Sequence, residues 1–95
     1  AIFACSDIYG MAAINAAHQL GLKVPEELSI IGFDNTNTSS MTEPSLTTVA
    51  QPIAQMGVQA CELLIEKIRD PKSPSQQIIL DTELVIRNST CPKKH

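Results

Sequence analysis

Residues 28–33 read LSIIGF, and Asp34 follows at once. The run is almost wholly apolar and holds two adjacent β-branched isoleucines, as expected of a parallel strand buried on both faces. Parallel strands need a crossover connection, usually a helix, so the sequence before this run decides which fold it belongs to.

The preceding segment supplies that crossover. Residues 2–5 (IFAC) form a second short apolar run, which predicts another buried strand. Residues 8–20 are rich in Ala and other helix formers, and Gly21 suits the left-handed position that ends a helix. The order strand, helix, strand predicts a right-handed unit with parallel strands. The predicted fold class is therefore α/β, with an open, mostly parallel sheet and flanking helices.

The rest of the chain predicts one more helix and further extended segments. Residues 34–44 (DNTNTSSMTEP) are polar and without periodicity, which predicts a long loop of the kind that often carries function. Residues 46–49 predict a short extended segment. Apolar residues then recur at helical spacing over 53–69, which predicts an amphipathic helix. Residues 78–86 alternate in polarity and predict a last strand or two half-strands.

Composition and charge limit the classes of function. The chain has 95 residues, of which 43% are hydrophobic and 18% charged, as in a small soluble globular domain. The formal net charge is -3, and the scattered basic residues give no surface for DNA, so any DNA binding needs another segment. No signal peptide or membrane-spanning run is visible. Residues 88–95 predict a frayed tail.

The cysteines and histidines predict neither a metal site nor an enzyme. Cys5, Cys61 and Cys91 are odd in number and lack zinc-type spacing, so we expect reduced, buried, small hydrophobes. His18 is expected on a helix and His95 in the tail, so neither is placed as the base of a nucleophile. The sequence predicts no catalytic residue, no cofactor and no metal.

Polar side chains follow the carboxyl ends of both predicted parallel strands, where open α/β sheets bind ligands. Ser6 and Asp7 follow the first strand, and Asp34 follows the second. Asp7 opens a helix, so we expect it to act mainly as a cap. Asp34 opens a loop instead and is predicted to contact a polar ligand. Two such carboxylates would also suit magnesium-dependent phosphoryl transfer, but no Gly-rich phosphate loop accompanies them.

Four motifs occur in order: AIFACSD at 1–7, GLKVPEELSIIGFDN at 21–35, EPSLTTVAQP at 43–52 and TELVIRNST at 82–90. Together they resemble the C-terminal portion of lactose/galactose-repressor family regulators. The resemblance implies a DNA-binding headpiece followed by a two-subdomain, sugar-binding core of periplasmic-binding-protein type. The chain would be a C-terminal fragment of that effector-binding core.

The resemblance also implies roles for particular residues. Ser6 aligns with a position that is usually Asn and faces the effector, and Asp34 aligns with the acid that binds effector hydroxyls. Gln51 and Ile53 align with positions beside the cleft. Ser6 is shorter than Asn, and Ile53 is aliphatic where an aromatic side chain sometimes stacks on a sugar ring.

The family's architecture implies subdomain crossings and a dimer. Residues 48–51 would form one crossing and 78–87 would contain the return, so that 53–77 would belong to an N-terminal subdomain absent from the chain. The residues implied at the dimer interface are Met11, Asn15, His18 and Met41. The alternatives are a Met11 buried within the monomer and a solvated His18.

The predicted function is the sensor of a cytoplasmic repressor. It would bind a sugar-like effector, form a homodimer and contact operator DNA only through the absent headpiece, with no membrane partner. The alternative is a periplasmic sugar-binding protein of a transporter, which shares the fold.

Overall fold

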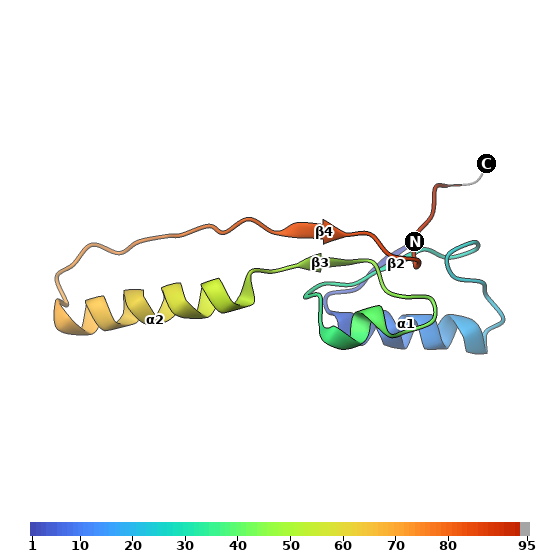
Figure 1. Ribbon diagram of the computed structural model, residues 1–95, viewed down its shortest axis with the longest axis horizontal. Helices are drawn as coiled ribbons and strands as arrows, with labels where there is room; N and C mark the ends of the chain where they lie inside the picture. Colours follow the sequence, from blue (N-terminus) through green and yellow to red (C-terminus); the bar gives the residue numbers. More distant parts are fainter. Residues whose placement is uncertain (94–95) are drawn as a thin grey trace. The chain divides into compact units, whose positions relative to one another are not determined.

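The computed structural model describes residues 1–93. It divides into two compact units, a first unit of Ala1–Gln51 with the segment from Glu83 onward, and a second unit of Pro52–Thr82. The elements follow in the order β1 (Ile2–Phe3), α1 (Asp7–Gln19), β2 (Ile30–Ile31), a 3₁₀ helix η1 (Asn37–Ser40), β3 (Thr48–Ala50), α2 (Ile53–Arg69) and β4 (Glu83–Val85) (Figure 1).

The strands of the first unit form the predicted open, mostly parallel arrangement. β1 pairs parallel with β2, and β3 pairs antiparallel with β4. Two isolated parallel bridges, Ile31 to Thr47 and Asp34 to Ala50, join the β2 side to the β3 side. The carboxyl end of β2 thus lies beside β3, which places Asp34 next to the start of the predicted crossing.

A small aliphatic core holds α1 against these strands. Ile30 and Leu46 are fully buried, and α1 contributes Ile14 and Ala17. Gly10 lets the helix approach closely, because a Cβ there would lie 2.9 Å from a methyl carbon of Leu46. Aliphatic residues and small side chains therefore do the packing, as the scarcity of aromatic residues requires.

Both helices match their predicted bounds to within a residue. Ser6 is the N-cap of α1, where its Oγ accepts the backbone N–H of Tyr9 at 3.4 Å. Gly21 follows the helix with a φ of +75°, the left-handed conformation expected at a helix end. α2 runs over the whole predicted range and has no buried residue.

Several predictions of burial and extent were wrong. Ile2 and Phe3 are 41% and 66% exposed, because β1 pairs only with β2 among residues 1–93. Cys5 and Cys61 are exposed and Cys91 is partly buried, so the predicted burial of the cysteines does not hold. Cys61 lies on α2, which has no buried residue in this chain.

The polar loop and the C-terminal segments also differ from their predictions. η1 occupies part of the predicted loop, and the last strand is limited to β4. The predicted frayed tail begins with a buried contact, since Ser89 Oγ donates to Ile30 O at 2.5 Å and accepts from Thr47 N at 2.8 Å. Residues 94 and 95 of that tail lie outside the described residues.

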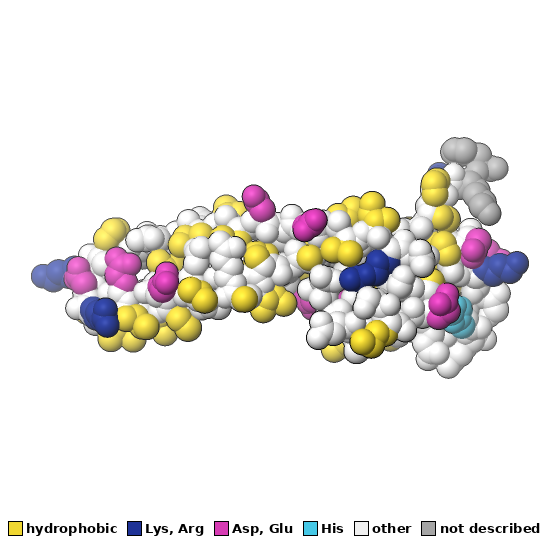
Figure 2. Space-filling model, viewed as in Figure 1, with side chains coloured by type: hydrophobic (Ala, Val, Ile, Leu, Met, Phe, Trp, Pro, Cys, Tyr) yellow, Lys and Arg dark blue, Asp and Glu magenta, His cyan; other side chains and the backbone are white. Residues whose placement is uncertain are grey.

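The second unit exposes much of its apolar surface (Figure 2). The large hydrophobic side chains that α2 exposes are Ile53, Met56, Val58, Leu64, Ile65 and Ile68. After the helix, Lys67 Nζ donates to Ser73 O at 2.7 Å across the turn. Within residues 1–93, no helix combines the length and the apolar character needed to cross a membrane.

Candidate functional site

Asp34 lies at the carboxyl end of β2 in an unusual backbone conformation. Its φ is +124°, and the φ of Asn35 is +60°. Two successive residues with side chains in this region carry strain, which is typical of functional sites. The backbone N–H of Asp34 donates to Val49 O at 2.9 Å, which ties this turn to β3.

Gln51 and Asp34, both predicted ligand residues, contact each other directly. Gln51 Nε2 donates to Asp34 Oδ1 at 2.6 Å, and both side chains are partly exposed. Within residues 1–93, Oδ2 of Asp34 accepts no hydrogen bond. The pair offers an oriented carboxylate with an open acceptor oxygen, which suits the hydroxyl groups of a polyol.

Ser6 and Ile53 are placed differently. Ser6 lies at the same sheet edge, since the backbone N–H of Asp7 donates to Phe33 O at 2.9 Å, but its hydroxyl caps α1. Ile53 begins α2 in the second unit and is 61% exposed. The predicted roles of Ser6 and Ile53 in binding stay predictions.

Asp7 does not cap its helix, contrary to prediction. Its side chain is fully buried, with Oδ1 accepting from Thr48 Oγ1 at 2.5 Å. Oδ2 accepts from Thr36 N at 2.6 Å and from Thr36 Oγ1 at 3.1 Å. The carboxylate fits because Gly32 has no side chain: a Cβ there would lie 2.5 Å from Oδ1. A local capping rule cannot detect bonds to residues so distant in sequence.

The sequence did not predict the hydrogen bonds that the guanidinium of Arg87 makes. Its Nη1 donates to Ser39 Oγ at 2.7 Å and to Leu46 O at 2.9 Å. Its Nη2 donates to Asn35 Oδ1 at 2.7 Å, directly after Asp34 in sequence. The available signal was a single Arg within an alternating apolar segment, which did not stand out from an ordinary exposed charge.

The residues implied at a dimer interface divide into two groups. Met11 is partly buried and packs against the core of the first unit, and its role at a dimer interface stays a prediction. Asn15, His18 and Met41 are exposed, with Met41 at 77%.

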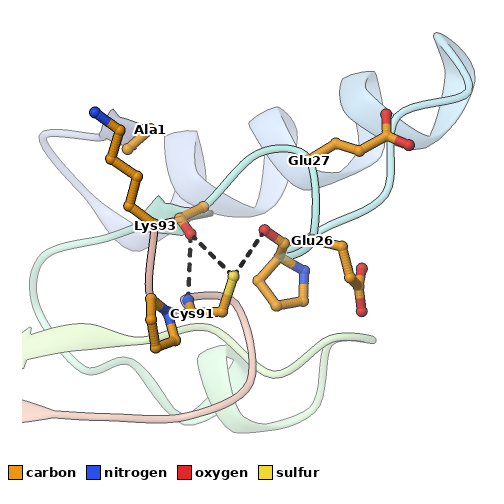
Figure 3. Close-up of a pocket in the computed structure, with 8 residues that line it drawn as sticks. Ala1, Glu26, Glu27, Cys91 and Lys93 are labelled. Atoms are coloured by element: carbon orange, nitrogen blue, oxygen red, sulfur yellow. Dashed lines mark hydrogen bonds between the residues drawn. The ribbon is translucent and has the colours of Figure 1, made fainter. Parts of the chain in front are cut away.

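A separate pocket of about 400 Å³ lies near Ser29 and Cys91 (Figure 3). Cys91 N donates to Ser29 Oγ at 3.2 Å, and Cys91 Sγ donates to Pro25 O at 3.3 Å. Ser29 precedes β2, so this pocket lies at the amino end of the strand. Because open α/β sheets bind ligands beyond the carboxyl ends of their strands, the Asp34–Gln51 pair is the better candidate site.

Comparison with known proteins identifies the family to which this fold belongs. The model of the periplasmic binding protein-like domain matches residues 1–90, and the chain belongs to that family. The transcriptional regulator DegA of Bacillus subtilis is 50% identical over 92 residues, which are 97% of this chain and 27% of that protein. The repressor CytR of Escherichia coli is 43% identical over 90 residues, 95% of this chain and 26% of that protein.

Solved structures give the same result. A LacI family regulator from Enterococcus faecium with bound ribose superposes with a TM-score of 0.85 at 34% identity, covering 97% of this chain and 34% of that one. These matches confirm the resemblance to lactose/galactose-repressor family regulators. The chain spans about a quarter of the length of the curated relatives, 27% and 26% of these two.

Proposed function

We propose that this chain is part of the sensor domain of a transcription regulator. The sensor binds a small, sugar-like effector at the Asp34–Gln51 pair and controls DNA binding by a headpiece outside this chain. The observation that carries the proposal is the 2.6 Å bond from Gln51 to Asp34, on a strained turn at the carboxyl end of a strand. The relatives named above are regulators, and one of them holds ribose.

The chemistry of the pair supports a polyol rather than a reactive substrate. A carboxylate oxygen can accept hydrogen bonds from two hydroxyls, and bonds to a charged group contribute about 1.5–3 kcal/mol each. Gln51 adds an amide oxygen as a second acceptor. The effector is bound and released unchanged in this proposal, and its binding shifts the closure of two subdomains.

The proposal also assigns the second unit to another subdomain. We propose that residues 53–77 pack against an N-terminal subdomain, with 48–51 as one crossing and the return within 78–87. The boundaries of the second unit at Pro52 and Thr82 and the exposed apolar side chains of α2 support this assignment. Covering those side chains would remove apolar area from water at about 25 cal/mol per Å².

We further propose a cytoplasmic homodimer that uses the face with Met11, Asn15 and His18 together with Met41. The exposure of Asn15, His18 and Met41 supports this role, and Met41 is a large apolar side chain at the surface. The alternative, a periplasmic binding protein of a transporter, is less favoured because the relatives are named as regulators.

The test is calorimetric titration of the full-length protein with ribose and a panel of other pentoses, hexoses and disaccharides. We expect binding by the parent protein, and a loss of about tenfold or more in affinity for Asp34→Ala, since each 1.4 kcal/mol is a factor of ten. Operator binding without sugar should survive the substitution. If Asp34→Ala binds the sugar with parental affinity, the proposed effector site is wrong.

A further inference from the structure

The buried carboxylate of Asp7 joins three elements at the sheet edge where Asp34 lies. Asp7 is the first residue of α1, Thr36 lies between the strained turn and η1, and Thr48 begins β3. The carboxylate is 0% exposed, and both of its oxygens accept hydrogen bonds from these two threonines. No effector can contact a side chain that is fully buried in this way.

Asp7 is also connected by hydrogen bonds to the turn that carries Asp34. The hydroxyl of Thr48 donates its hydrogen to Asp7 Oδ1, and the oxygen of that hydroxyl, Thr48 Oγ1, accepts the backbone N–H of Asn35 at 3.3 Å. The next backbone N–H, that of Thr36, donates directly to Asp7 Oδ2 at 2.6 Å. Asp7 therefore holds two successive backbone N–H groups, one directly and one through Thr48.

That turn needs such support because its backbone is unfavourable. The φ values of +124° at Asp34 and +60° at Asn35 are in the region that side chains disfavour. A strained backbone of this kind persists only when the surrounding contacts determine it. The side chain of Asp34 extends from this turn, and its Oδ1 accepts the hydrogen bond from Gln51 Nε2.

We propose that Asp7 is a positioning residue for effector binding, which acts through the turn and Asp34 without contacting the effector. The inference rests on the proposed function of Asp34. A carboxylate suits this place, because Oδ2 faces the backbone N–H of Thr36, which can only donate, and Oδ1 accepts the hydrogen of the Thr48 hydroxyl. In Asp7→Asn, the amide NH₂ would face either Thr36 N–H or Thr48 Oγ1. In the second case the amide donates to Thr48 Oγ1 and the hydroxyl hydrogen loses its acceptor, so the hydroxyl must reorient, which disturbs the oxygen that accepts the N–H of Asn35.

The first experiment measures the turn itself, without sugar. Peptide-resolved amide hydrogen exchange is compared for the full-length parent protein, Asp7→Asn and Gly21→Ala. The control, Gly21→Ala, strains the other end of α1, where φ is +75° and nothing lies within 4 Å of the added Cβ. We expect exchange at residues 35 and 36 to rise by about tenfold in Asp7→Asn, as for the loss of one hydrogen bond, and to stay parental in the control.

The second experiment is a double-mutant cycle read by ribose affinity, or by the affinity for the best sugar of the panel. Asp7→Asn should weaken binding by about tenfold in the parent protein and have little further effect when Asp34 is already Ala, because coupled residues are not additive. Each protein is titrated at the same number of degrees below its own melting temperature. Under these conditions Gly21→Ala should leave the affinity unchanged.

The outcomes separate the inference from the proposed function. Unchanged exchange at residues 35 and 36 overturns the inference, as does a loss of affinity that is equal in Asp7→Asn and Gly21→Ala or fully additive with Asp34→Ala. Parental affinity in Asp34→Ala overturns the proposed site instead. If the parent protein binds no sugar of the panel, the proposed effector class is wrong, while the exchange rates still decide whether Asp7 holds the turn.

Discussion

The first unit buries apolar and polar side chains, whereas the second unit buries none, although both units expose large hydrophobic side chains. Asp7, Ser39, Thr47, Thr48 and Ser89 are buried in the first unit. Within residues 1–93, no buried side-chain nitrogen or oxygen lacks a hydrogen-bond partner. The helix of the second unit has no buried residue and exposes six large hydrophobic side chains. The first unit thus satisfies its own polar groups, while the second unit has no buried core of its own.

The largest expected effect concerns the 95-residue chain by itself. Its exposed apolar stripe on α2 should cause self-association, because large apolar patches in water favour contact with other surfaces. A chain of this length has little stability to lose, so a cooperative thermal transition is not expected. Sedimentation and thermal melting of the isolated chain measure both properties. A monomer that melts cooperatively would contradict this prediction. It would show that the exposed apolar side chains of α2 need no partner to pack against.

One glycine substitution in each unit tests the difference in packing at a single position. Gly32→Ala in the first unit should destabilise the full-length protein by about 3 kcal/mol, the upper end for overpacking, because the new Cβ would meet Asp7 at both Oδ1 and Cα. Gly57→Ala in α2 meets nothing within 4 Å, so it should stabilise the helix of the isolated chain by about 0.5–1 kcal/mol. Melting temperatures of the full-length protein measure the first effect, and far-ultraviolet dichroism of the isolated chain measures the second.

The sign of the Gly57→Ala effect in the full-length protein is informative. If Gly57→Ala destabilises that protein while raising the helicity of the isolated chain, another layer packs closely on Gly57, as the proposed cover of α2 requires. A parental melting temperature for Gly32→Ala would contradict the close approach of Asp7 to this glycine.

The sequence predicted those features that depend on local patterns. Apolar periodicity gave the bounds of α2, and the left-handed preference of Gly gave the end of α1 at Gly21. The fold class and the family resemblance are confirmed, and the predicted residues Asp34 and Gln51 do meet. Burial was predicted less well, because the exposure of Ile2 and of the cysteines depends on which layers cover them rather than on their own polarity.

The contacts that the sequence did not predict join residues far apart in the chain. Asp7 bonds to a residue 29 positions away, and Arg87 to one 52 positions away. Capping preferences and periodicity describe neighbours within a few positions, so they assigned Asp7 to its own helix and gave Arg87 no role. Such pairings follow from the tertiary arrangement of β2, β3 and the segment after β4.

Replacing one cationic side chain in each unit should give the smallest difference in stability between the paired variants. Arg87→Met should destabilise the full-length protein by about 2 kcal/mol, because Ser39, Leu46 and Asn35 lose hydrogen bonds from a charged donor at a partly buried site. Lys67→Met, the control in the second unit, should change the stability by less than about 0.5 kcal/mol, since its one bond to Ser73 is exposed. Met preserves most of the apolar length of either side chain, so the comparison isolates the charged group. Thermal melts of the two variants at one salt concentration measure the difference. Equal losses would show that the bonds of Arg87 stabilise the first unit no more than an exposed lysine stabilises the second.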